Sequence, residues 1–175
     1  MNTGRTIRVV QGLVAVGWRA WTVEETGDGV RLGSVIHDAI WEPGVVAVAG
    51  CADSHPAPDG ECNCGFHAAR DPVDAFSYLL GRDGPHTLCR VLGEVVLGGR
   101  LAETEAGWRA SEAYPMRLYT EDTDLAEALA AYRVPVLSSE WTSASATSST
   151  PASAGSSTSS WSAARMRSSS TAASG

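Results

Sequence analysis

Four residues of types that bind metal ions lie close together in the sequence: Cys51, His55, Cys62 and Cys64. Three cysteine sulfurs and one histidine nitrogen are a ligand set with which structural zinc sites complete their tetrahedral coordination. The spacing ends in a C-x-C pair, which is tighter than the cysteine pairs of zinc ribbons. Both sulfurs of this pair can still reach one ion if Asn63 adopts a turn conformation. We therefore predict a structural site formed by these four residues, with zinc as the cofactor.

Each of these residues also has a simpler interpretation. Cys51 follows an apolar run and can be an ordinary buried thiol, since free cysteine packs as a small hydrophobe. Cys62 and Cys64 can form a redox pair. His67, three residues after Cys64, is an alternative fourth ligand. Cys89 lies far along the chain in a predicted strand, and we expect it to be a buried or partly buried free thiol.

The metal site allows two classes of function. If all four ligands bind, zinc holds a long loop against the sheet, and the chain is a small binding or regulatory module for an unknown protein or small-molecule ligand. If a water replaces one ligand, the chain is a small metal-dependent enzyme with Glu61 or Asp53 as the base. The sequence contains no zinc-deaminase, HExxH, GxSxG or P-loop motif. The four-ligand module is therefore favoured, and we assign no catalytic residue.

Composition and charge narrow the partners and the location. The net charge is −7, and all thirteen basic residues are arginine. Residues 142–175 contain two of these arginines and no acidic residue, so the rest of the chain is more acidic than the whole. Such a chain is poorly suited to the phosphate backbone of nucleic acid. No apolar run approaches the roughly 18–20 residues of a membrane span, and the N-terminus lacks a signal-peptide pattern. We expect a cytoplasmic protein that binds neither nucleic acid nor membrane.

The segments that position the metal ligands are short and rich in β-forming residues. Apolar runs punctuated by glycines predict strands within residues 7–23 and 88–119, and Asp28-Gly29 predicts a hairpin turn. The apolar run over residues 45–50 predicts a buried strand that delivers Cys51 at its end. The ligands are thus expected in a loop that begins where this strand stops.

Two helices complete the predicted domain. Asp71-Pro72 and Thr123-Asp124 are typical of helix starts, because Asp or Thr can cap the first turn and proline fits its geometry. We predict a small α+β domain over residues 1–137, with a mostly antiparallel, bent sheet, two short helices and a loop pinned by zinc. Residues 138–175 are mostly Ser, Thr and Ala and have too little apolar surface to offset the entropy of ordering. We expect them to form a disordered tail.

One short sequence occurs twice. Gly17-Trp18-Arg19-Ala20 recurs as Gly107-Trp108-Arg109-Ala110. The simpler interpretation is that both are strand starts with a tryptophan in the core and an exposed arginine. The alternative is that the two segments are related by symmetry or line one groove together.

Three stretches of the sequence carry a resemblance to a known family: Trp41-x-Pro43-Gly44 with Ala49-x-Cys51; His55-x-Ala57-Pro58 with Cys62-x-Cys64-Gly65-Phe66-His67-Ala68; and Gly93-x-Val95 with Gly107-Trp108-Arg109-Ala110 and Ala113-Tyr114-Pro115. The region from Gly17 to Tyr119 resembles a family of short hypothetical proteins encoded by actinobacteria and their phages. In that family the position of His67 is often tyrosine, so the resemblance favours His55 as the fourth ligand. It implies no activity.

Overall fold

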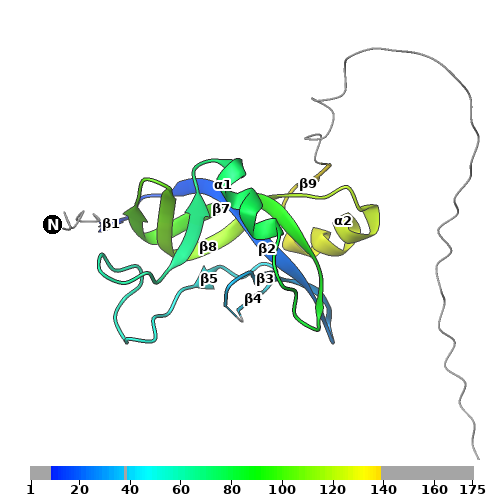
Figure 1. Ribbon diagram of the computed structural model, residues 1–175, viewed down its shortest axis with the longest axis horizontal. Helices are drawn as coiled ribbons and strands as arrows, with labels where there is room; N and C mark the ends of the chain where they lie inside the picture. The colour runs from blue at the N-terminus through cyan, green and yellow to red at the C-terminus, as the bar shows by residue number, and fades with distance from the viewer. Residues whose placement is uncertain (1–8, 38, 139–175) are drawn as a thin grey trace, which may run out of the picture. The chain divides into compact units, whose positions relative to one another are not determined.

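The fold is described for residues 9–37 and 39–138 in a computed structural model of the chain. The chain divides into two units, Met1–Thr142 and Ser143–Gly175, and the fold below is that of the first. This unit contains a mostly antiparallel sheet and two short α-helices (Figure 1), which confirms the predicted α+β class. The predicted disordered tail lies outside the described residues except for Ser138.

The described residues form one sheet around two long strands, β7 and β8, which lie side by side in antiparallel register. The strands are β1 (Val9–Gln11), β2 (Ala15–Thr26), β3 (Gly29–Ser34), β4 (Ile40–Trp41), β5 (Ala47–Val48), β6 (Phe66–Ala69), β7 (Thr87–Glu103), β8 (Gly107–Tyr119) and β9 (Val136–Leu137). The predicted hairpin turn joins β2 to β3, where Gly29 has a φ of 110°. Glycine tolerates this left-handed conformation because it has no Cβ atom.

The sheet closes on itself through the short strand β6. β7 pairs with β2 along one edge and with β8 along the other, and β6 pairs with both β8 and β2. Two glycines permit this close approach. A Cβ atom on Gly17 would lie 2.8 Å from the Cβ of Ala68, and a Cβ atom on Gly107 would lie 1.9 Å from the Ala68 carbonyl oxygen. The bend predicted from the sequence is therefore a complete closure.

Three short strands share the edge of β8 that β7 leaves free. β6 pairs with the first part of β8, β5 with its middle, and β9 with its end. Because β5 and β6 both run antiparallel to β8, the end of β5 meets the start of β6, and the Ala49 N–H donates to the Ser111 carbonyl between them (2.8 Å). The chain thus leaves this edge after β5, forms a loop of residues 49–65, and rejoins the same edge as β6.

The apolar run before this loop is not the buried strand that its sequence predicts. Only Ala47–Val48 are in a strand, and in the described residues this strand pairs with β8 alone. Val45, Val46 and Val48 have exposed fractions of 57%, 52% and 74%. The prediction is wrong because a short apolar run has the same pattern in a central strand and in an edge strand that no second layer covers.

Aromatic side chains fill the interior of the closed sheet. Trp21 and Trp41 meet edge to face with ring centroids 5.6 Å apart, and Phe66 packs on Trp41 at 4.9 Å. The buried hydroxyl of Tyr132 accepts a hydrogen bond from the Leu32 N–H (2.7 Å) and donates one to the Trp41 carbonyl. This hydroxyl therefore ties β3 and β4 to the C-terminal part of the domain.

The two α-helices begin close to their predicted starts. α1 (Pro72–Phe76) is capped by Asp71, whose carboxylate accepts the Val73 N–H, and continues as the 3₁₀ helix η1 (Ser77–Leu79). α2 (Thr123–Leu129) is followed by η2 (Ala130–Tyr132), and its cap is Asp122, one residue before the predicted cap. Both carboxylates satisfy N–H groups that the first helical turn leaves free. None of the helices among the described residues is long and apolar enough to cross a membrane.

Candidate metal centre

The loop of residues 49–65 carries all four predicted ligands and is anchored by the sheet at both ends. Cys51 lies just after the loop leaves β5, and Cys64 lies just before it rejoins the edge as β6. Gly65 makes the return, with a φ of 103° and its Cα facing the β8 backbone so closely that a Cβ atom would lie 3.0 Å from the Ala110 carbonyl oxygen. Strand pairing therefore places the first and last of the four predicted ligands near each other.

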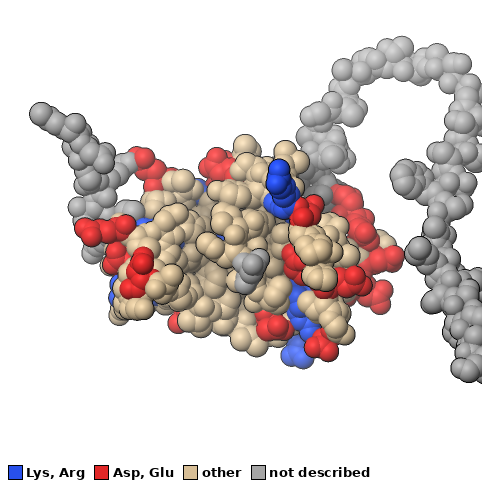
Figure 2. Space-filling model, turned by 60° about the horizontal axis from the view of Figure 1, so that its bottom comes forward, with Lys and Arg blue, Asp and Glu red and all other residues tan. Residues whose placement is uncertain are grey.

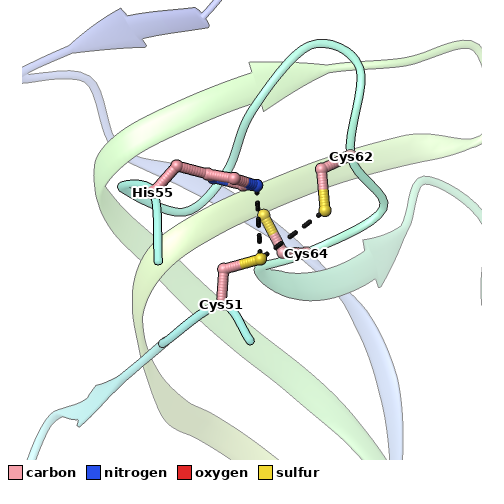
Figure 3. A group of neighbouring side chains, drawn as sticks. All are labelled: Cys51, His55, Cys62 and Cys64. Carbon is pink, nitrogen blue, oxygen red and sulfur yellow. Dashed lines mark hydrogen bonds between the residues drawn. The ribbon is translucent and has the colours of Figure 1, made fainter. Parts of the chain in front are cut away.

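The structure brings the four predicted residues into one cluster (Figure 3). Their ligand atoms all lie within 4.8 Å of one another, and each residue is partly buried. The Cys51 sulfur lies 3.3 Å from Nε2 of His55 and 3.6 Å from the Cys62 sulfur. A zinc ion with ordinary bond lengths holds two sulfurs about 3.8 Å apart and a sulfur and a nitrogen about 3.5 Å apart. The cluster therefore has the size and the ligand types of a tetrahedral zinc site.

The alternative residues lie outside the cluster. His67 is on β6, and its Nε2 lies 3.0 Å from the Asn63 carbonyl oxygen, to which it can donate a hydrogen bond. Cys89 is on β7 and is a partly buried free thiol, as predicted. Cys62 and Cys64 are also free thiols and form no disulfide with each other. Of the residues considered from the sequence, the geometry therefore favours the original four.

Hydrogen bonds within the cluster shift the pKa values of its members in opposite directions. The hydrogen bond between the thiols of Cys51 and Cys62 is the main reason why the pKa of Cys62 is lowered. A hydrogen bond to Cys62 also raises the pKa of His55. The Asp53 backbone lowers the pKa of Cys51, but desolvation and hydrogen bonds to Cys62 and Cys64 outweigh it and raise that pKa to about 11. Protons on Cys51 and His55 thus compete with a metal ion, and binding must release them.

A buried arginine lies beneath the loop. Arg109 of β8 is only 4% exposed, and its guanidinium donates to the carbonyl oxygens of Asp59 (3.0 Å), Cys62 and Cys64 (3.3 Å). Arg100 reaches the Pro58 carbonyl at 3.5 Å. The interpretation of Arg109 as an exposed arginine is wrong, because the loop folds over its side chain. Sequence reasoning missed this role, although the repeated Gly-Trp-Arg-Ala segment was a signal.

The two repeated segments flank β6. Trp18 of the first segment pairs with Ala69, and the second segment pairs with the whole of β6. Arg19 of the first segment donates to the His67 carbonyl (2.6 Å) and packs on the Trp41 ring, and burial lowers its pKa to about 10. Both arginines thus donate to backbone carbonyls near β6. Of the two, only Arg109 makes a described hydrogen bond to the loop of residues 49–65, which we call the metal loop.

A separate cavity of about 400 Å³ lies over the β2–β3 hairpin. Its lining includes residues 33–37, residues 84–87, and Thr22 and Glu24 of β2. None of the four cluster residues lines it, and neither do Asp53 and Glu61, the bases considered for a catalytic metal. Both of these carboxylates are exposed. This cavity is therefore separate from the cluster.

Comparisons of the chain with protein-family models, with curated proteins and with solved structures found no match. The functional assignment therefore depends on the geometry of the cluster and its surroundings.

Proposed function

We propose that this chain is a small zinc-stabilised binding or regulatory module. The observation that carries the proposal is the convergence of three sulfurs and one imidazole nitrogen within 4.8 Å in a single loop. This donor set is soft, complete for tetrahedral coordination and typical of structural zinc. A metal in this position would hold residues 51–64 against the edge of β8, and its binding free energy would add directly to the stability of the fold.

The partner that we propose is a protein or a small molecule other than nucleic acid. Figure 2 shows acidic side chains over the visible face of the domain and few arginines, which supports this choice because nucleic acid binding relies on basic side chains. Exposed valines before the loop, Val45, Val46 and Val48, supply apolar surface on the same segment as the ligands. We also infer a cytoplasmic location, because four free cysteines suit a reducing compartment.

The proposal is tested by measuring the metal content of the purified full-length chain and by cobalt substitution. We expect one zinc per chain and, with Co²⁺, the strong visible absorption of a tetrahedral ion with thiolate ligands. Cys62→Ser and Cys64→Ser should lose the metal, whereas Cys89→Ser should retain it. A metal-free wild type, or a Cys62→Ser variant with full zinc content, would refute the assignment. An exchangeable water on the bound cobalt would instead support the catalytic alternative, with Glu61 or Asp53 as the base.

A further inference from the structure

Arg109 is a buried cation whose described partners are all neutral. The side chain is 4% exposed, and its hydrogen bonds go to three backbone carbonyls, those of Asp59, Cys62 and Cys64. Within the described residues, the ion pairs of the domain involve other arginines. A buried charge without an opposite charge is costly, so a compensating negative group is expected close to it.

The metal loop can supply that negative charge. A divalent zinc ion bound by three thiolates and one neutral imidazole carries a net charge of −1. Two of the three carbonyls that contact Arg109 belong to Cys62 and Cys64, which are predicted ligands. The guanidinium thus binds the backbone of two residues whose side chains would be thiolates in the zinc complex. The titratable and charged groups near this contact include the Asp59 carboxylate, which accepts the Glu61 N–H, and Arg100, which makes only a long contact with the Pro58 carbonyl. His67 lies opposite Arg109 in the pairing of β6 with β8.

We propose that Arg109 is the counter-cation of the metal centre and sets its affinity for zinc. This inference rests on the proposed function, because it requires a bound zinc ion. The guanidinium neutralises the −1 charge of the zinc–thiolate group, and its planar fork fixes the turn that aims Cys62 and Cys64 at one point. Arginine suits this position better than lysine, since several carbonyls must be reached from one rigid group.

The repeated sequence provides a matched control. Arg19 occupies the same position in Gly17-Trp18-Arg19-Ala20 and also donates to a backbone carbonyl near β6, that of His67. Its described hydrogen bonds go to His67 and Ser34 and not to the metal loop. Arg19→Met therefore removes a guanidinium of similar setting without touching the proposed centre.

The test is a chelator-competition titration that measures the zinc dissociation constant of the full-length wild type and of four variants. Arg109→Met and Arg109→Gln should weaken zinc binding by about tenfold to a hundredfold, the usual effect of losing a residue that supports metal ligands. Arg109→Lys keeps the charge and should lose less than Arg109→Gln. Arg19→Met should bind zinc within about threefold of the wild type, which is well below the range expected for supporting residues.

Four outcomes overturn the inference. If Arg109→Gln binds zinc as tightly as the wild type while Arg109→Lys is weakened, the hydrogen bonds matter and the charge does not. If Arg109→Met and Arg19→Met are weakened equally, Arg109 acts only through the general stability of the fold. If the wild type binds no zinc, the inference falls together with the proposed function, whereas equal affinity in the wild type and all Arg109 variants removes the inference alone. Should Arg109→Met fail to fold, the comparison of Arg109→Lys with Arg109→Gln still decides between charge and hydrogen bonding.

Discussion

Replacing Tyr132 with phenylalanine tests the hydrogen bonds that hold β3 and β4 to the end of the domain. The tyrosine is 1% exposed, and its hydroxyl accepts the Leu32 N–H and donates to the Trp41 carbonyl. Phenylalanine keeps the ring and removes only the hydroxyl. The buried N–H of Leu32 then lacks this acceptor, and the carbonyl of Trp41 lacks this donor.

The expected loss of stability follows from these two groups. A buried backbone group without a partner costs about 1–3 kcal/mol, and both groups lie where water does not reach easily. Tyr132→Phe should therefore lower the free energy of unfolding by about 2–4 kcal/mol. For a domain of this size, that change corresponds to a fall in melting temperature of roughly 10 °C.

The measurement is thermal and urea unfolding of the zinc-loaded chain, followed by circular dichroism. Tyr114→Phe is the matched control, because the Tyr114 hydroxyl also makes two hydrogen bonds, to the Gly44 N–H (2.6 Å) and the Tyr132 carbonyl (2.9 Å), but lies in a partly exposed position. Water can replace its bonds, so we expect a loss of about 1 kcal/mol. The reasoning is refuted if Tyr114→Phe destabilises the domain as much as Tyr132→Phe does.

The same hydroxyl predicts how stability depends on alkaline pH. Burial is the main cause that raises the pKa of Tyr132 to about 12, from 10.0 for an unperturbed tyrosine. The unfolded chain therefore loses this proton more readily than the folded chain. The contribution of the neutral phenol to stability is complete below pH 10 and is lost as the pH rises through 12. Alkaline unfolding curves of the wild type should show this loss, and those of Tyr132→Phe should lack this component.

The remaining predictions concern the metal and the closure of the sheet. Zinc that is free at about a hundredfold above its dissociation constant stabilises the chain by about 2.7 kcal/mol. Removing it with a chelator should therefore lower the melting temperature of the wild type by roughly 10 °C. Cys89→Ser should show the same fall, and Cys62→Ser should show none. Zinc affinity should decrease as the pH falls, because protons compete for the thiolates; an affinity that is constant between pH 8 and pH 5.5 would contradict cysteine ligation. Gly107→Ala should prevent normal folding, judged by circular dichroism, because the added Cβ would lie 1.9 Å from the Ala68 carbonyl oxygen. Gly98→Ala has open space around the added atom, with its nearest neighbour at 4.0 Å, and should be tolerated; equal damage from both would contradict the role of Gly107 in closure.

The local features of the fold were predictable from the sequence because neighbouring residues determine them. Asp71 caps α1 as its position before Pro72 indicates, and the turn at Gly29 follows from its need for a left-handed backbone. The four cluster residues were selected by their chemical types and spacing, and the loop that contains them brings them together. In each case the relevant contacts lie within a few residues or within one loop.

The features that the sequence did not predict depend on contacts between distant segments. The closure through β6 joins β2 and β8, which are separated by most of the domain, and a strand as short as β6 has no pattern of its own. The exposure of Val48 and the burial of Arg109 have the same origin. Whether a valine lies at an edge, or an arginine beneath a loop, is decided by the arrangement of strands and not by the residue type.

The interruption between β5 and β6 has a consequence for how this protein can change over time. The two ends of the loop of residues 49–65 lie next to each other on one edge of β8. The loop therefore interrupts what would otherwise be one continuous strand along that edge. Ala57 and Pro58 are buried and Arg109 binds the Asp59 carbonyl, so this part of the loop is fixed to the sheet. Exposed residues such as Asp53 and Glu61, in contrast, can change without altering the register of the sheet. The exposed residues of the loop can therefore diverge while the strands that present them stay constant.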